Sequence, residues 1–405
     1  MHRTRYLDGR TLRNRIVLLL LFFAVIQVSY YLFLSEGDRW FALVVLGYAG
    51  GILLVQRLIF LRMRDGDLTI PVNPSLFTFV YLICFAVVIV FSRLSYVLSF
   101  LSIGLLETRS AGLGQGGITS IIAIWFYPLC IVLAFLRIRT RQYYLLCIPM
   151  LIVLAIDIVA LGTRNAPFFV FIFHAITYHG SFLKFRRMFA ALGIVLLTVF
   201  IVDYQTKGRS LNTTSIGFHW SMMLEHSRIF RHAPVRDEVI ELSKDWSLVG
   251  PSVYLAGYIA HSQAEFRYLV GEGSFGAFGT PNYTMDEVCL VLFCPREPFQ
   301  NRIMEINPST GLYMTTLATF LFDFGYVGTA ILFVYIVLLS FVLPYRLYLP
   351  IAIYTCFVFS LGLIENYFYN GLGLARFVLF VILWQVFMSR RRSGARPAPR
   401  VPAQA

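Results

Sequence analysis

The feature that most constrains this chain is a succession of long apolar runs, each separated from the next by a polar segment. The runs lie at about 16–34, 41–56, 75–92, 117–136, 143–161, 167–183, 188–204, 326–343, 347–364 and 371–388. A helix needs roughly 20 apolar residues to cross a bilayer, so each run is long enough, or nearly long enough, to do so. The sequence predicts an all-α polytopic membrane protein with about ten transmembrane helices and one large external loop domain.

Composition and charge agree with this class. The chain is 58% hydrophobic with a mean hydropathy of +0.72, which is too apolar for a water-soluble protein. The formal net charge is +13, but the basic residues form short groups between the apolar runs instead of one basic face. This distribution argues against nucleic acid as a partner and instead encodes orientation in the bilayer.

Basic residues are concentrated in every second connecting segment. These segments carry Arg3, Arg5, Arg10, Arg13 and Arg15; Arg57, Arg62 and Arg64; Arg137, Arg139 and Arg141; Lys184, Arg186 and Arg187; Arg346; and Arg390, Arg391 and Arg392. Such segments face the cytoplasm, so an even number of spans puts both termini there. The first run is long and no small-residue cleavage site follows it, which favours a retained span over a signal peptide.

The predicted organisation has five parts. They are a basic cytoplasmic N-terminus at 1–15, spans one to seven at 16–204, a large external loop domain at 205–310, an interfacial helix with spans eight to ten at 311–388, and a disordered basic cytoplasmic tail at 389–405. An unstructured loop of that length is uncommon, so the external loop is the candidate functional domain. Within it, 252–270 reads as a helix lying on or dipping into the outer leaflet. Cys289 and Cys294 also fall there, and spacing alone leaves their pairing open.

Ionisable residues gather near the predicted outer ends of the spans. Asp157, Arg164, Asp203, Asp323, Glu365 and Arg376 lie there, together with Arg93, Arg109 and Arg209 in the predicted outer loops. Ionisable groups in a membrane are costly, so each is a candidate functional group. The planar guanidinium donates paired hydrogen bonds to phosphate oxygens, so these arginines suit a diphosphate anchored in lipid.

Several of these residues have a structural interpretation as well. Arg164, in the hairpin "LGTRNA", is either a ligand or a snorkelling interface anchor, and Asp157 either pairs with Arg164 or Arg376 or takes part in catalysis. His261 and Glu265 are spaced i, i+4 and either form a general base with its partner or belong to a solvated helix face.

The stretch "LFDFGYVG" interrupts an apolar run with an acid and two glycines. We expect a helix over about 311–321 at the outer interface, a turn at Asp323-Phe324-Gly325, and a span that begins near Tyr326. Asp323 either serves catalysis or caps the helix that follows it. The sequence has no Walker loop, HExxH pattern, Cys/His ligand set or nucleophile elbow, so we predict a reaction with no metal and no cofactor.

Topology and short motifs together resemble the bacterial O-antigen and capsule repeat-unit polymerases of the Wzy type. The resemblance rests on the span pattern, the late external loop, Gly162 and Arg164 in "LGTRNA", Arg109 in "ETRSAGLGQGG", and Thr315, Thr316, Thr319, Asp323, Phe324, Gly325 and Gly328 after the loop. It implies a glycosyltransferase of the bacterial inner membrane that moves a growing glycan from polyprenyl diphosphate onto an incoming lipid-linked repeat unit at the outer face. A chain-length regulator and a flippase would be its partners.

On that expectation, Arg109, Arg164, Arg209 and Arg376 bind the diphosphate, and Asp323, Glu365, His261 or Glu265 takes the acceptor proton. Arg209 is assigned by position alone. Two rival functions stay open. A glycan ligase would have nearly the same topology and chemistry, whereas a non-enzymatic flippase would be expected to place its ionisable residues in a central cavity and to show repeat symmetry.

Overall fold

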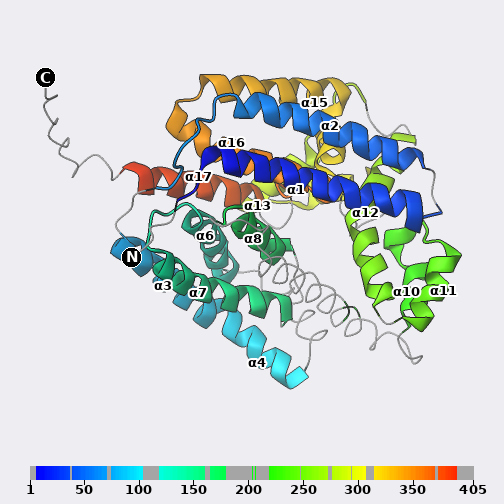
Figure 1. Ribbon diagram of the computed structural model, residues 1–405, viewed down its shortest axis with the longest axis horizontal. Coiled ribbons are helices and arrows are strands. Elements are labelled where there is room, and N and C mark those ends of the chain that lie inside the picture. The colour runs from blue at the N-terminus through cyan, green and yellow to red at the C-terminus, as the bar shows by residue number, and fades with distance from the viewer. Residues whose placement is uncertain are drawn as a thin grey trace, which may run out of the picture.

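The computed structural model describes residues 6–36, 39–70, 74–103, 118–159, 165–178, 203, 206, 219–246, 248–271, 276–292, 294–306, 314–369 and 373–389. All secondary-structure elements in these residues are helices, and the only β-type pairs recorded among them are three isolated bridges. The predicted all-α class is therefore confirmed (Figure 1).

Nine of the predicted spans coincide with helices. These are α1 (Gly9–Ser29) continued by η1 (Tyr30–Leu34), α2 (Trp40–Phe60), α3 (Pro74–Val88) continued by η2 (Ile89–Arg93) and α4 (Leu94–Ile103), α6 (Ile118–Leu133), α7 (Thr140–Val159), α8 (Asn165–Ile176), α15 (Thr316–Val342), α16 (Tyr345–Leu361) and α17 (Gly373–Ser389). The predicted span at 188–204 lies outside the described residues except for Asp203.

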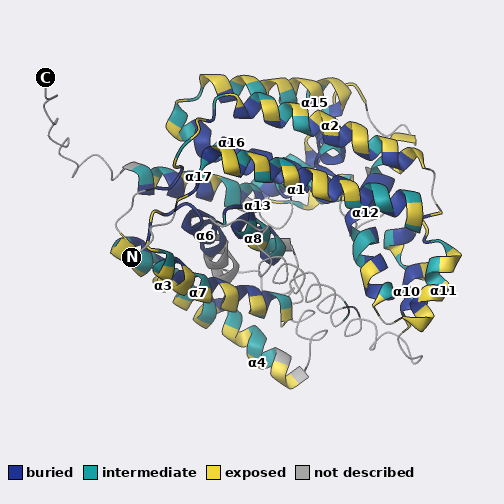
Figure 2. Cartoon of the chain, in the orientation of Figure 1, coloured by how far each residue is buried: buried dark blue, intermediate teal, exposed yellow. Residues whose placement is uncertain are grey.

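Five helical segments among the described residues are long and apolar enough to cross a membrane. They are Gly9–Leu34, Trp40–Phe60, Pro74–Ser99, Thr140–Val159 and Thr316–Val342, while Ala166–Ile176, Tyr345–Leu361 and Gly373–Met388 are shorter apolar helices. Their outward faces carry exposed leucine, valine and phenylalanine, for example Leu18, Phe79 and Val334 (Figure 2). Large apolar side chains exposed along whole helix faces suit hydrocarbon as the surrounding solvent, so the chain is an all-α membrane protein.

The first helix lies at the centre of the packing. One stripe of α1, which includes Leu12, Ile16, Leu20, Phe23 and Gln27, is buried at helical spacing. Through this stripe α1 packs against α2, α16 and α12, while α17 packs against α6 on the other side of the bundle (Figure 1). An apolar helix in a membrane packs one stripe against neighbouring helices and leaves the opposite face exposed to lipid, and α1 has this pattern.

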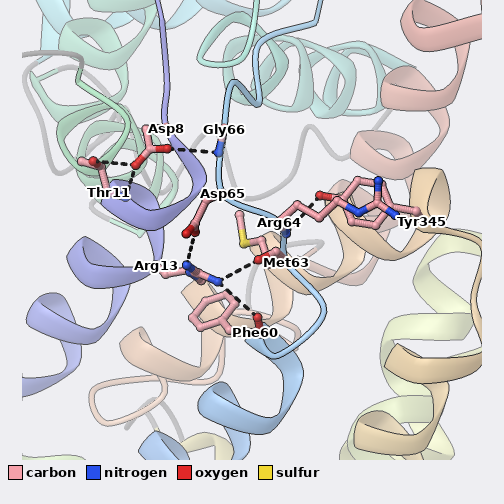
Figure 3. Close-up of polar contacts among 9 residues, drawn as sticks. All are labelled: Asp8, Thr11, Arg13, Phe60, Met63, Arg64, Asp65, Gly66 and Tyr345. Atoms are coloured by element: carbon pink, nitrogen blue, oxygen red, sulfur yellow. Dashed lines mark hydrogen bonds and ion pairs between the residues drawn. The ribbon is translucent and has the colours of Figure 1, made fainter.

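The end of the bundle where α2 leads into α3 is the predicted inner end. Here the Arg13 guanidinium donates to the Met63 carbonyl at 2.7 Å and forms an ion pair with Asp65 (Figure 3). Asp8 caps α1 by accepting a hydrogen bond from the Thr11 amide at 2.9 Å, and it also accepts one from the Gly66 amide. The basic residues of this end therefore also tie helix ends together.

The predicted external loop folds into helices at the opposite end, where α1 leads into α2. These are α10 (Trp220–His226), η3 (Arg228–Phe230), α11 (Asp237–Asp245), α12 (Val249–Gly271), α13 (Asn282–Leu292) and α14 (Glu297–Ile306). We call this end the predicted outer end. Cys289 and Cys294 form a disulfide, which resolves the pairing that the sequence left open.

Helix α12, which the sequence predicts on or in the outer leaflet, packs among other helices of the chain. Thirteen of its residues are buried, and it packs against α1, α2, η1, α10, α11 and η3. The Gln27 side chain of α1 donates to the Ile259 carbonyl of α12 at 2.6 Å, and the Tyr31 hydroxyl donates to the Ala260 carbonyl. The Ser262 hydroxyl of α12 donates to the Leu363 carbonyl at 2.8 Å, so polar groups of this helix bond within the protein.

The break predicted in "LFDFGYVG" is present. Helix α15 begins at Thr316, with Thr315 as its cap, and is interrupted at Gly325, where φ is 67°. The Tyr326 and Val327 amides, freed by the break, donate to the Gly276 and Ala277 carbonyls at 3.0 Å each. A side chain at Gly325 would put Cβ 2.5 Å from both of those carbonyl oxygens, so the turn needs glycine for its conformation and for the close approach.

Candidate functional site

Arginines and acids from five parts of the chain meet near the predicted outer end. They are Arg93 of η2, Asp157 of α7, Glu287 of α13, Glu365 after α16, and Arg376 of α17, and we call them the arginine–acid cluster. The sequence placed four of these five residues at one end of the spans, and the structure brings those four together.

The best-defined contact in the cluster is the ion pair between Arg93 and Asp157. Arg93 Nε lies 2.7 Å from Asp157 Oδ1, and an Nη atom donates to Oδ2 at 3.2 Å. The Tyr127 hydroxyl donates to the same carboxylate, which is 1% exposed. Because a buried carboxylate needs such partners, Asp157 holds Arg93 and Tyr127 in place. The sequence proposed Arg164 or Arg376 as its partner and did not consider Arg93.

Arg376 has fewer partners. It lies half-buried in the first turn of α17, with its guanidinium carbon 5.1 Å from the centroid of the Tyr127 ring. Its Nε is buried and forms no hydrogen bond within the described part of the chain. The charges of Glu287 and Asp157 act on it, but a cation in the first turn of a helix also opposes the helix dipole. Arg376 therefore retains hydrogen-bonding capacity for an anion.

Glu287 is a buried acid with an unused acceptor. The residue is 4% exposed, and its Oε2 has no hydrogen-bond partner among the described residues. Burial and the neighbouring Asp286 raise the pKa of Glu287 to about 7, against the opposing charges of Arg296 and Arg376. Asp286 itself is bound by Arg296 through two hydrogen bonds, at 2.8 and 2.6 Å. A carboxyl group with a pKa near 7 and a free oxygen suits proton transfer.

Sequence reasoning missed Glu287. It stands in "MDEVC", beside another acid and within the predicted external loop, where carboxylates are ordinarily solvated. The spacing of residues along the chain does not show that this acid is buried, because its burial comes from packing of α13 against α15 and α17.

Glu365 is also buried, at 2% exposure, in the turn that follows α16. Burial raises its pKa well above the usual range, and the Arg376 guanidinium acts in the opposite direction. The sequence placed this acid and Arg376 at the same end of the spans, and the charge of Arg376 acts on it.

Asp323 has a different role from the cap suggested by the sequence. Its carboxylate accepts hydrogen bonds from the Tyr283 amide at 2.8 Å, the Thr284 amide at 2.7 Å and the Thr284 hydroxyl at 2.7 Å. It therefore caps α13, which precedes it in the chain, and not the helix that follows it. With three donors occupying both oxygens, and 1% exposure, Asp323 positions α13 and is a poor proton acceptor.

A short polar chain continues from Asp323. Thr284 is hydrogen-bonded to the Tyr369 hydroxyl, and the Tyr283 and Tyr369 rings stack with centroids 6.4 Å apart. Glu287 lies one helical turn beyond Thr284 on α13, and its charge acts on Tyr369. Asp323 thus fixes the helix that carries Glu287 into the cluster.

His261 and Glu265 lie elsewhere, on α12. Both are 2% exposed, so the solvated-face interpretation is wrong. Glu265 lies 3.5 Å from His232 Nε2, whose ring stacks on Tyr268, and burial raises the Glu265 pKa to about 7. Burial lowers the His261 pKa to about 4, and its Nδ1 lies 2.6 Å from the Tyr258 carbonyl oxygen. Glu265 therefore contacts His232 and not His261.

Three predicted diphosphate ligands, Arg109, Arg164 and Arg209, lie outside the described residues. In the part of the chain that the structure does describe, no three His, Cys, Asp or Glu side chains are grouped as metal ligands. Asp203, another acid of the predicted outer ring, accepts a hydrogen bond from the Trp220 indole at 2.8 Å.

The cluster combines two things that a transfer reaction on an anionic lipid requires. Arginine with unused donors can bind phosphate oxygens, and a buried acid of raised pKa can take a proton. Comparison with known proteins adds no assignment: no family model, no curated protein and no solved structure matches the chain.

Proposed function

We propose that the protein is a membrane glycosyltransferase that polymerises lipid-linked oligosaccharide repeat units, as the resemblance to Wzy-type polymerases implies. It would act at the outer face of the bacterial inner membrane, with about ten spans and both termini in the cytoplasm. The observation that carries the proposal is the pair of buried groups with unused hydrogen-bonding capacity, Arg376 Nε and Glu287 Oε2, in one cluster at the predicted outer end.

In the proposed reaction, a hydroxyl oxygen of the incoming repeat unit attacks the anomeric carbon of the growing glycan. The bond from that carbon to the diphosphate breaks, the glycosidic bond forms, and polyprenyl diphosphate leaves. Arg376, with Arg93 held beside it by Asp157, would stabilise the charge that develops on the leaving diphosphate. Glu287 would accept the hydroxyl proton in its carboxylate form.

The other predicted catalytic acids take supporting roles in this proposal. Asp323 orients α13 through Tyr283 and Thr284, and the buried Glu365 lies close enough to Arg376 for the guanidinium charge to act on it. His261 and Glu265 belong to the packing between α12 and the η3 region, where the His232 pair lies.

The test is deletion of the gene in its native host, followed by sizing of the surface and lipid-linked glycans on a gel. We expect loss of the long-chain ladder with single repeat units still attached to their acceptor. The wild-type gene and Arg13→Ala should restore the ladder, and Arg376→Ala should not, at equal membrane levels. Arg13 is the matched control because it is an arginine at the predicted inner end whose guanidinium donates to the Met63 carbonyl and pairs with Asp65.

Other outcomes would assign the rival functions. Accumulation of long polymer on the lipid carrier would identify a glycan ligase. Repeat units trapped on the cytoplasmic leaflet would identify a flippase, and an unchanged ladder would overturn the proposal.

A further inference from the structure

A groove of about 270 Å³ lies between the second half of α15, α16 and the start of α17. Its floor and walls are almost wholly apolar, and the α15 side is a stripe of Leu332, Ile336, Leu339 and Leu343 at helical spacing. Tyr348, Ile351 and Ala352 of α16 and Leu374 and Phe377 of α17 lie opposite. The stripe residues Leu332, Ile336 and Leu339 are half-buried, whereas their neighbours Val334 and Leu338 are each 58% exposed.

The length of the groove is close to the thickness of a membrane. It runs along α15 from Phe324 to Leu343, and at 1.5 Å per residue this corresponds to about 28 Å. The hydrocarbon core of a bilayer is about 30 Å thick. One extended hydrocarbon chain would therefore lie along most of the hydrocarbon depth.

The two ends of the groove differ in chemistry. Ile59, Ser340 and Tyr348 line the predicted inner end, whereas Thr284 and Tyr369 line the other end. Thr284 and Tyr369 form the polar chain that links Asp323 to the arginine–acid cluster, since the charge of Glu287 acts on Tyr369 and on Arg376. The apolar groove thus ends beside the arginine–acid cluster.

We infer that this groove holds the single polyprenyl chain of the diphosphate-linked donor. The chain lies between α15, α16 and α17, and its diphosphate lies beyond Thr284 and Tyr369, toward Arg376. This inference rests on the proposed function and specifies where the lipid lies. A single prenyl chain suits one stripe of α15 better than the paired chains of a phospholipid, and the guanidinium of Arg376 complements a diphosphate.

The test uses the purified full-length protein and two tryptophan variants of α15. Leu339→Trp fills the groove, whereas Leu338→Trp adds the same side chain one residue away on the exposed face. Native mass spectrometry would measure retention of a long-chain polyprenol, which lacks the diphosphate, in the presence of excess phosphatidylglycerol. We expect Leu339→Trp to weaken polyprenol retention at least about tenfold and Leu338→Trp to leave it unchanged.

Ile336→Trp, one turn from Leu339, is the second groove variant, and thermal melts establish that each variant is folded. Equal retention of polyprenol by the wild type and by folded groove variants would overturn the inference. So would displacement of polyprenol by phosphatidylglycerol at equal concentration, because the groove would then be a site for bilayer lipid. The proposed function is tested separately. An unchanged glycan ladder in the deletion strain would overturn the proposal of polymerisation, whereas polyprenol binding in the groove would still stand.

Discussion

Three arginines at the predicted inner end and Arg376 at the predicted outer end differ in how their guanidinium groups are bound. At the predicted inner end, Arg13, Arg15 and Arg62 donate to backbone carbonyls at 2.7, 3.0 and 2.6 Å respectively. At the predicted outer end, Arg376 rests on the Tyr127 ring and keeps a buried Nε without a hydrogen bond in the described part of the chain.

The difference separates structural arginines from a candidate binding group. An arginine that donates to carbonyl oxygens at a helix end satisfies those carbonyls, and its own donors need no ligand. A partly buried arginine with an unused donor costs stability, so it is retained where a ligand repays that cost. The same contrast holds for acids, since Asp8 caps α1 at the inner end while Glu287 keeps a free oxygen at the outer end.

The largest expected effect is that of Arg376→Ala on the glycan ladder. We expect polymer formation to fall at least about 100-fold, because a charge-stabilising donor at the leaving group is lost. Arg376→Lys should retain part of the activity, since the charge remains but the paired donors do not. Quantified ladder intensity in complemented deletion strains, at matched membrane levels, measures both. An Arg376→Ala strain with a normal ladder would erase the contrast between the two ends.

Glu287→Gln should lower the rate about 100-fold while leaving the fold intact. The pH dependence sharpens this prediction. The Glu287 pKa is about 7, so the carboxylate that accepts the proton is depleted below pH 7. Polymerisation in membrane vesicles should therefore rise with pH through about 7 and then level off. If the wild-type profile is flat between pH 5.5 and 8, Glu287 is not the base.

Asp323→Ala should destabilise the protein by about 3 kcal/mol, because the part-buried Tyr283 and Thr284 amides would lose their acceptor. The matched change at the inner end is Asp8→Ala, which removes an ordinary cap of α1 and should cost about 1 kcal/mol. Thermal melts in detergent compare the two. Equal melting temperatures for the variants would contradict the role of Asp323 in holding α13.

Two glycines with positive φ should differ by a smaller amount in the stability lost on substitution. Gly66→Ala meets no atom within 4 Å and should cost about 1 kcal/mol from backbone strain alone. Gly325→Ala adds contacts of 2.5 Å with the Gly276 and Ala277 carbonyls and should cost about 2 kcal/mol or more. A Gly325→Ala variant as stable as Gly66→Ala would mean that the 276–277 segment moves away freely.

The sequence predicted those features of the fold that depend on local residue patterns. Apolar runs located nine helices, and an acid followed by glycine in "LFDFGYVG" located the break in α15. It did not predict partners that are far apart in the chain. Asp323 caps a helix that begins about forty residues earlier, and Glu265 meets His232 and not His261. Glu287 could not be singled out, because its burial and free oxygen arise only when α13 packs against α15 and α17.

The central claim is that Arg376, whose Nε forms no hydrogen bond in the described part of the chain, binds a diphosphate. The most direct measurement is titration calorimetry of the purified protein with farnesyl diphosphate, with farnesol as the control for the chain. We predict that the wild type and Arg13→Ala bind the diphosphate equally, more tightly than farnesol, and that Arg376→Ala binds it at least about tenfold more weakly. Equal affinity of Arg376→Ala and the wild type for farnesyl diphosphate would contradict the claim.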